Sequence, residues 1–252
     1  MCHSVLSTRY LVLFPWVSLY YITDRQLFPG PEPHRRERLL TKISEAARAG
    51  VDYVQLREKD LLGRELEALA RQAVQICREI RNEERETRLL VNSRSDIALA
   101  TGAAGVHLPS DDISASDARA TWSAALARDS RLETRSFVIA VSCHSVEEVR
   151  LAHSRGADFA VFGPVFEKIG TSLRAGIDAL RAACRVSPMP VLAIGGVTLE
   201  NALACIEAGA AGIAAIRLFQ ENEIIQVVEM LQKKVNDVEK PAGGAPSPRN
   251  SR

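Results

Sequence analysis

The chain has 252 residues, of which 46% are hydrophobic and 25% are charged, a composition typical of a globular protein that buries a sizeable core. Its 32 basic and 31 acidic residues give a formal net charge of +1, so the basic excess typical of nucleic-acid-binding proteins is absent. The five cysteines have no C-x-x-C spacing, which indicates free thiols in a reducing compartment rather than a zinc site or a disulfide framework.

The chain begins with residues that we expect to lie outside the folded domain. Residues 11–22 are almost continuously apolar and loosely resemble a signal sequence, but no small-residue cleavage site follows them. This stretch is also too short to span a bilayer. We therefore expect an N-terminal extension over residues 1–14, a first buried strand at 16–23, no membrane partner and a cytoplasmic location.

Short apolar runs then alternate with longer segments of helical periodicity. We expect buried strands at 16–23, 51–56, 88–92, 104–108, 137–142, 157–162, 189–194 and 211–216. We expect helices at 37–50, 61–84, 96–102, 114–128, 146–156, 172–186, 199–209 and 221–238. The similar phrases A-R-A-G-V-D-Y-V, H-S-R-G-A-D-F-A and I-E-A-G-A-A-G-I each place a helix-ending glycine directly before a strand.

This regular alternation predicts an α/β fold, a single (β/α)8 TIM barrel over residues 15–238. A doubly wound parallel sheet is the competing fold, but the chain has no early G-x-G-x-x-G and no break in composition between its units. Residues 239–252 are rich in proline, glycine and serine and are expected to form a disordered C-terminal tail.

The segment V-D-Y-V-Q-L-R-E-K-D carries the first candidate site. Gln55, Arg57 and Lys59 occupy alternate positions, and alternate side chains of a strand share one face. A buried strand gains nothing from three polar groups on one face unless they bind something, and two of these groups are cationic. Active sites of TIM barrels lie at the carboxyl ends of the strands. These three residues, here called the first anion pole, are therefore predicted to bind a phosphate or diphosphate.

A second candidate site follows the last two strands. Gly195 and Gly196 precede a predicted helix start, where free backbone N–H groups favour an anion. Ile216 and Arg217 end the eighth strand, and phosphate sites of this fold recur after strands seven and eight. We call these four residues the second anion pole. Polar residues or glycines follow all eight strands, so we expect the barrel mouth to be the site.

Six motifs occur in order along residues 18–219: V-Q-L-R-E-K, L-V-N-S-R-S-D-I-A-L, G-V-H-L-P-S-D-D, V-S-C-H-S-V-E-E, G-A-D-F-A-V-F-G-P-V-F and A-I-G-G-V-T. Together they resemble the thiamine phosphate synthase/TenI family. The resemblance implies a (β/α)8 barrel that acts in thiamine biosynthesis. The synthase branch joins hydroxymethylpyrimidine diphosphate to a thiazole phosphate and releases pyrophosphate with magnesium. The TenI branch includes a thiazole tautomerase, which moves a proton.

The resemblance also implies roles for matched residues. Gln55, Arg57 and Lys59 match residues that hold the pyrimidine and its diphosphate, and Asn92 matches a diphosphate contact. The implied mechanism is dissociative: magnesium and cationic side chains stabilise the departing pyrophosphate, and the thiazole nitrogen captures the pyrimidine carbocation. Arg57 and Lys59 are accordingly predicted to be catalytic, together with Ser142 and His144, and Gln55 and Asn92 to bind substrate.

Other matches concern the metal and the thiazole phosphate. Asp112 matches one of two magnesium-binding aspartates, Ser142 a substrate-contacting serine, and Gly196 a glycine whose backbone holds the thiazole phosphate. Ser93 replaces the second aspartate, which predicts weakened binding of Mg²⁺ because hard cations prefer charged oxygens. Lys168 is a plausible substitute for a diphosphate-binding lysine in a loop that matches the family less closely.

Histidines and a cysteine leave alternatives open. His144 is a candidate acid/base for a tautomerase, or it orients Ser142 or a loop carbonyl. His107 is expected to pack at the end of its strand rather than bind a ligand. Cys143 is disfavoured as a nucleophile because neighbouring strand residues face opposite ways. Arg217 stands where synthases commonly have serine, and N-S-R-S-D-I-A-L is closer to the TenI branch.

Three hypotheses follow from this sequence. The leading one is a thiamine phosphate synthase-type transferase that uses Mg²⁺ and takes small phosphorylated pyrimidine and thiazole substrates. The second is a TenI-like thiazole tautomerase with His144 as acid/base. The third is a barrel that binds thiamine-pathway phosphates without turnover. A homo-oligomer is compatible with each hypothesis, and no nucleic-acid or membrane partner is expected.

Overall fold

The computed structural model describes residues 17–80, 86–128, 137–167 and 175–239. Eight parallel strands close into a barrel in chain order, each paired with the next and the eighth with the first, which confirms the predicted TIM barrel. The strands are β1 (Ser18–Ile22), β2 (Tyr53–Leu56), β3 (Arg88–Asn92), β4 (Gly105–Leu108), β5 (Val138–Cys143), β6 (Phe159–Phe162), β7 (Val191–Ile194) and β8 (Gly212–Ala215).

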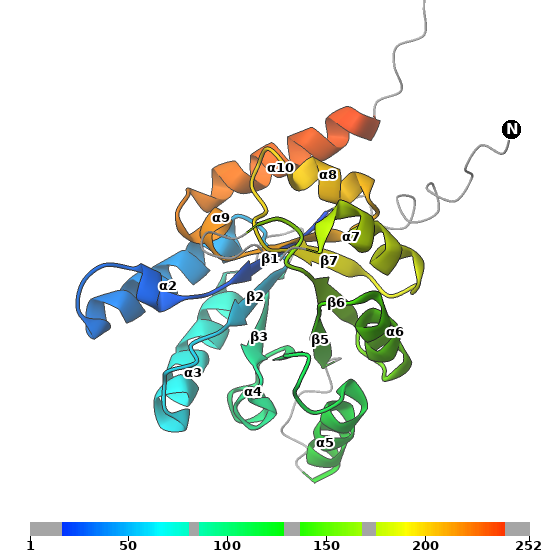
Figure 1. Cartoon of the computed structure of the whole chain (residues 1–252). Helices are drawn as coiled ribbons and strands as arrows, with labels where there is room; N and C mark the ends of the chain where they lie inside the picture. Colours follow the sequence, from blue (N-terminus) through cyan, green and yellow to red (C-terminus); the bar gives the residue numbers. More distant parts are fainter. Residues whose placement is uncertain (1–16, 81–85, 129–136, 168–174, 240–252) are drawn as a thin grey trace, which may run out of the picture.

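Helices connect the strands and lie around the outside of the barrel (Figure 1). They are η1 (Arg25–Leu27), α2 (Glu32–Arg48), α3 (Gly63–Glu79), α4 (Ser95–Thr101), α5 (Ala115–Arg128), α6 (Val146–Ser154), α7 (Gly176–Arg185), α8 (Ala202–Glu207), α9 (Arg217–Gln220) and α10 (Ile224–Glu239). In the part of the chain that the structure describes, none of these helices is long and apolar enough to cross a membrane.

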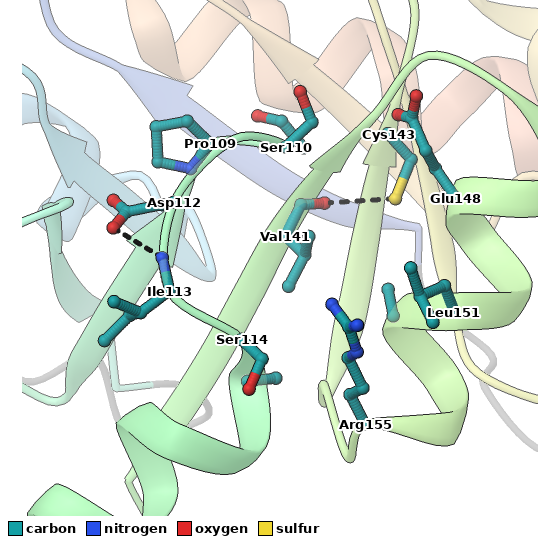
Figure 2. A pocket seen from close by; sticks show the side chains of 13 residues that line it. Pro109, Ser110, Asp112, Ile113, Ser114, Val141, Cys143, Glu148, Leu151 and Arg155 are labelled. Carbon is teal, nitrogen blue, oxygen red and sulfur yellow. Dashed lines mark hydrogen bonds between the residues drawn. The ribbon is translucent and has the colours of Figure 1, made fainter.

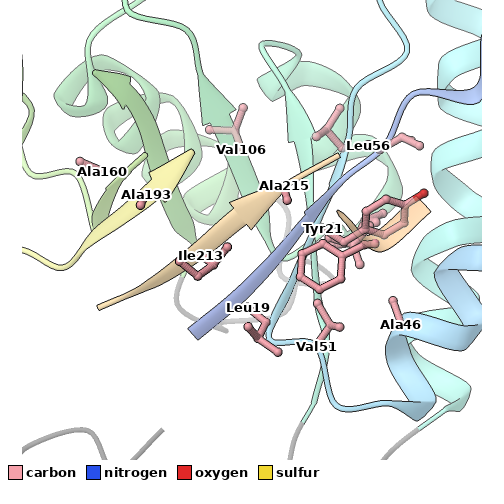
Figure 3. Packing of buried hydrophobic residues seen from close by; sticks show 14 of the residues in the cluster. Leu19, Tyr21, Ala46, Val51, Leu56, Val106, Ala160, Ala193, Ile213 and Ala215 are labelled. Atoms are coloured by element: carbon pink, nitrogen blue, oxygen red, sulfur yellow. The ribbon is translucent and has the colours of Figure 1, made fainter. Parts of the chain in front are cut away.

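The strands divide their side chains between two cores, as the period of two requires. Leu19 and Tyr21 of β1 point outward and pack with residues of α2 such as Ala46 (Figure 3). Tyr20 and Ile22 of the same strand point inward, into a smaller cluster with Phe159 of β6. Parallel register pairs Ile22 with Gln55, so the Gln55 side chain also belongs to the interior.

The observed elements are mostly shorter than or shifted from the expected ranges, and α2, α8 and α9 show the clearest differences. Helix α2 begins at Glu32 rather than at residue 37, because Pro31 is its N-cap and a proline is accommodated in the first helical turn. Helix α8 begins at Ala202 rather than at residue 199. The short helix α9 was not expected, because its four residues are too few to show a helical period.

Both predicted chain ends fall largely outside the described residues. The N-terminal extension 1–14 lies outside them, as do residues 240–252 of the expected tail. Helix α10 includes Glu239, so the first residue assigned to the tail is helical.

Candidate active site

The first anion pole lies partly beyond β2. The strand ends at Leu56, so the expectation that Gln55, Arg57 and Lys59 share one strand face is wrong for Arg57 and Lys59, which follow the strand. Gln55 lies inside the barrel with 2% of its surface exposed, and its Nε2 donates to Asn92 Oδ1 at 2.8 Å. Its Oε1 is buried and has no hydrogen-bond partner within the described residues. An unpaired buried acceptor is costly, so this oxygen is suited to a donor on a bound molecule.

The positive charge of Arg57 contributes to the lowered pKa of His107, a residue inside the barrel. Burial, with a smaller contribution from the positive charge of Arg57, lowers the pKa of His107 to about 3. His107 belongs to β4 and is 3% exposed, and Arg57, one residue beyond β2, is half-buried. Lys59 lies in the turn that follows and is exposed. Within the described residues, the side chains of Arg57 and Lys59 have no ion-pair partner.

Asn92 and Ser93 form the end of the neighbouring strand. Asn92 accepts from Gln55 and donates from Nδ2 to Ser93 Oγ at 3.2 Å. Ser93 has a φ of +60°, in the left-handed region, and its N–H donates to the carbonyl of His107 at 2.9 Å. Asparagine and aspartate adopt this conformation more readily than serine does. The backbone at this position is therefore shaped for the aspartate that the sequence lacks.

His107 has a larger role than the packing that the sequence predicts. Its Nδ1 lies 3.0 Å from the hydroxyl of Tyr20, and its Nε2 lies 2.7 Å from Ser142 Oγ. Because its pKa is lowered to about 3, the imidazole is neutral at neutral pH. The chain from Tyr20 through His107 fixes the hydroxyl of Ser142 at the mouth. The residue types at strand ends were visible in the sequence, but this contact between strands was not.

The contacts of His144 and the burial of Cys143 bear on the alternatives left open for these two residues at the end of β5. His144 is exposed, and its Nδ1 lies 2.5 Å from the carbonyl oxygen of Gly163, so it contacts a loop carbonyl rather than Ser142. Cys143 is buried on the outer side of the strand, and burial, followed by the charge of Glu148, raises the pKa of its thiol to about 12. A thiol that is protonated at neutral pH is a poor nucleophile, so this reading is excluded.

Asp112 lies at the edge of a small pocket between the β4–α5 loop, β5 and α6 (Figure 2). One of its carboxylate oxygens accepts from the N–H of Ile113 at 2.8 Å. Glu148 and Arg155 line the side formed by α6. The pocket has a volume of about 50 Å³, which is too small for a substrate. Its relevance to the site is that Asp112 lies at its edge.

The second anion pole is built mainly from backbone. Gly195 and Gly196 have φ of +94° and +64° and follow β7 directly. A Cβ on Gly196 would lie 2.6 Å from the carbonyl oxygen of Glu167, so only glycine fits this close approach. The helix expected next begins six residues after Gly196, so its N-terminus does not follow the glycine pair as predicted.

No helix begins directly after the glycine pair, but the short helix α9 begins directly after β8 and offers a helix N-terminus there. Ile216 is its N-cap and packs against the interior cluster of the barrel, and Arg217 is its first residue. The Arg217 side chain is 59% exposed and pairs with Glu221 at 3.1 Å. Gln220 anchors α9 to the end of β1 by accepting from the Tyr21 hydroxyl at 3.0 Å and from the N–H of Asp24 at 3.2 Å. A short extra helix after β8 is a recurring phosphate-binding element of TIM barrels.

This chain is similar to known proteins in both sequence and structure. A family model described as thiamine monophosphate synthase matches residues 19–219. The chain belongs to the thiamine monophosphate synthase family. It is 38% identical over 181 residues to a thiamine-phosphate synthase of Chlorobium luteolum, covering 70% of this chain and 77% of that protein. It is 36% identical over 201 residues to one of Methanospirillum hungatei, covering 79% and 87%.

A solved structure agrees with these relatives. A thiamine phosphate pyrophosphorylase of Pyrococcus furiosus matches with a TM-score of 0.70 and 28% identity, covering 89% of this chain and 98% of that one. The predicted family and the predicted fold are therefore both confirmed. The roles of individual residues remain predictions, and Lys168 lies outside the described residues.

For a member of the thiamine monophosphate synthase family, the donors for a metal are few. No group of three or more His, Cys, Asp or Glu side chains in the described ranges is arranged to hold an ion. Of the two positions predicted to face a metal, Asp112 would supply a carboxylate and Ser93 only a hydroxyl. Mg²⁺ is commonly held by one or two carboxylates together with substrate phosphates. The donor set therefore fits an ion that arrives with a diphosphate rather than one held by the protein alone.

Proposed function

We propose that this protein is a thiamine phosphate synthase, which joins hydroxymethylpyrimidine diphosphate to thiazole phosphate and releases pyrophosphate. The observation that carries the proposal is the pair of anion poles at one barrel mouth. The first pole offers two cationic side chains with no ion-pair partner in the described residues, and the second offers glycine backbone and the start of α9. Two substrates with separate phosphate groups need two such poles.

In this proposal the first anion pole stabilises the leaving group. As the bond between the pyrimidine methylene carbon and the diphosphate oxygen breaks, negative charge grows on the departing pyrophosphate. Arg57 and Lys59 stabilise that charge, and the thiazole nitrogen then forms the new bond to the carbon. Gln55 Oε1 accepts a hydrogen bond from the pyrimidine. Asp112 would hold a magnesium ion that binds with the diphosphate, and the ion would supply further positive charge there.

The second anion pole orients the nucleophile in this proposal. The phosphate of the thiazole binds the backbone at Gly195 and Gly196 and the N–H groups at the start of α9, near Ile216 and Arg217. Ser142, held by neutral His107, contacts the substrates between the two poles. The thiazole nitrogen is thereby held toward the pyrimidine without any covalent intermediate on the protein, which is the advantage of fixed orientation.

The experiment that tests the function is an assay with both phosphorylated substrates and Mg²⁺. We expect thiamine phosphate and pyrophosphate to form in equal amounts, and Lys59→Ala to lower the rate by about 10²-fold because a charge on the leaving group is no longer stabilised. Arg36→Gln, which removes a cation on α2 outside both poles, is the matched control. A wild-type protein that forms no product under these conditions would contradict the proposal.

One observation favours the tautomerase as a second candidate. Because a carbonyl oxygen only accepts, His144 Nδ1 carries a proton directed at Gly163, and Nε2 is the ring nitrogen left for a substrate. This is the form that a general base requires. Aromatisation of the thiazole precursor without metal, abolished by His144→Ala, would establish this activity. Tight binding of both phosphates without either reaction would establish the non-catalytic hypothesis.

We also propose, as predictions from the sequence, a cytoplasmic location and small-molecule partners only. A homo-oligomer is retained as a prediction that size-exclusion chromatography with light scattering would test.

A further inference from the structure

We propose that Arg25 is a positioning residue for the first anion pole, which holds two neighbouring carboxylates away from Arg57 and Lys59. This inference rests on the proposed function, because it concerns how that pole remains available to an anion. Arg25 lies in η1, outside the motif V-Q-L-R-E-K that contains the residues of the pole.

The need for such a residue follows from the local sequence R-E-K-D. Glu58 and Asp60 alternate with Arg57 and Lys59, so each cation has an acidic neighbour. Carboxylates that were free to turn toward these cations would pair with them and compete with a bound phosphate. In the structure neither carboxylate does so, because both are engaged by Arg25.

Two nitrogens of the Arg25 side chain bind Glu58 and Asp60, and the third binds Glu32. Its Nη1 donates to Glu58 Oε2 at 3.0 Å and to Asp60 Oδ1 at 2.6 Å, and its Nη2 donates to Asp60 Oδ2 at 2.6 Å. Its Nε donates to Glu32 Oε1 at 2.8 Å. Arg25 is 3% exposed and the Glu58 side chain 1%, so that contact is shielded from solvent, whereas the side chains of Asp60 and Glu32 are 45% and 40% exposed. A planar guanidinium can hold a carboxylate with two parallel bonds, whereas a lysine ammonium cannot reproduce that fork.

Glu58 is held on the side away from the barrel interior. Its side chain is 1% exposed and accepts from the Thr23 hydroxyl at 2.6 Å and from the backbone N–H of Arg25 at 3.1 Å. Burial, only partly opposed by these hydrogen bonds, raises the pKa of Glu58 above its ordinary value. A buried carboxylate depends on its partners, so Glu58 has little freedom to turn.

The same network reaches the backbone of the pole. The N–H of Arg57 donates to Thr23 Oγ1 at 3.0 Å, and that hydroxyl donates to Glu58. The N–H of Leu61 donates to the carbonyl of Glu58 at 3.3 Å. The chain is therefore fixed on both sides of Lys59, and Arg57 has its charge toward the interior while Glu58 faces Arg25.

The test compares Arg25→Lys with Arg36→Gln by calorimetric titration of pyrophosphate. Arg25→Lys keeps the charge and loses the fork, so we expect the Kd for pyrophosphate to rise about tenfold as Asp60 becomes free to pair with the pole. The double variant Arg25→Lys with Asp60→Asn should return to within about threefold of wild type, because the competing carboxylate is gone. Arg36→Gln breaks the neighbouring pairs with Glu32 and Glu65 and should leave the Kd unchanged.

A second readout separates this inference from the proposed function. Amide hydrogen exchange at Arg57 should become about fivefold faster in Arg25→Lys, because the Thr23–Glu58 arrangement that holds its N–H is weakened. If wild type binds no pyrophosphate, the proposed function fails, while the exchange rate still reports the positioning role. Unchanged exchange in Arg25→Lys, or faster exchange with an unchanged Kd, would overturn the inference.

Thr23→Val gives the same test if Arg25→Lys does not fold. This variant leaves every charge in place and removes only the hydroxyl between Glu58 and the Arg57 N–H. We expect faster exchange at Arg57 and a Kd for pyrophosphate about threefold higher. Faster exchange with an unchanged Kd would again overturn the inference.

Discussion

The two anion poles of this barrel are built in different ways. The first consists of side chains, Arg57 and Lys59, kept available by a buried ion-pair network around Arg25. The second consists mainly of backbone, Gly196 and the start of α9, and its cation Arg217 is paired on the surface. A side-chain pole supplies full charges, which suit a leaving diphosphate, whereas a backbone pole supplies shape and partial charges, which suit a phosphate that does not react.

The largest expected effect is on catalysis at the first pole. Arg57→Ala should lower kcat/KM for thiamine phosphate formation by about 10²–10³-fold, because a full charge near the leaving group is lost. Steady-state rates with both substrates and Mg²⁺ measure it. Arg217→Ala should cost only about threefold, because an exposed, paired arginine contributes little. Equal losses in the two variants would break the distinction between the poles.

The second pole should be sensitive to shape. Gly196→Ala should raise the Kd for thiazole phosphate at least about tenfold and lower the free energy of unfolding by about 2–4 kcal/mol, since strain at positive φ and a clash both contribute. Gly156→Ala is the matched control: its φ is +78°, but no atom lies within 4 Å of the added Cβ. It should cost only about 1 kcal/mol and leave binding unchanged. Urea unfolding and calorimetry measure both quantities, and similar costs would refute the close-approach argument.

The interior between the poles should respond to pH. The pKa of His107 is lowered from 6.5 to about 3, so the unfolded chain binds a proton at higher pH than the folded chain does. The stability that His107 contributes is therefore present above about pH 6.5 and is lost as pH falls toward 3, on the order of 1 kcal/mol per pH unit. Urea unfolding of wild type and His107→Gln at several pH values measures this slope. Parallel pH profiles would show that His107 is not neutral and buried.

A smaller effect is expected at Ser93, a proposed metal-facing position on the strand next to the first pole. Ser93→Asp adds a carboxylate at a position whose φ of +60° suits aspartate. The Mg²⁺ concentration that gives half-maximal activity should fall about fivefold, because a charged oxygen binds a hard cation better than a hydroxyl does. Ser93→Asn, which adopts the same conformation without the charge, is the control. Equal effects of the two variants would assign the change to the backbone.

The sequence predicted the parts of the site that depend on residue type and strand position. Apolar runs that alternate with helical segments predicted the barrel, and Gln55, Arg57 and Gly196 were proposed as site residues because polar residues and glycines at strand ends are chemically distinctive. Helix α9 was missed because four residues carry no period. Arg25 and Glu58 are 33 residues apart and meet because β1 pairs with β2, and Tyr20 and His107 are 87 apart and meet only across the barrel interior. Contacts between residues so far apart in the chain leave no pattern in the sequence around either residue.

The most direct test of the two-pole account is a set of four calorimetric titrations. Pyrophosphate and thiazole phosphate are each titrated into Arg57→Ala and into Gly196→Ala, with wild type as reference. The account predicts that pyrophosphate binding is lost only in Arg57→Ala and thiazole phosphate binding only in Gly196→Ala. Loss of both ligands in either variant, or unchanged pyrophosphate binding in Arg57→Ala, would contradict it.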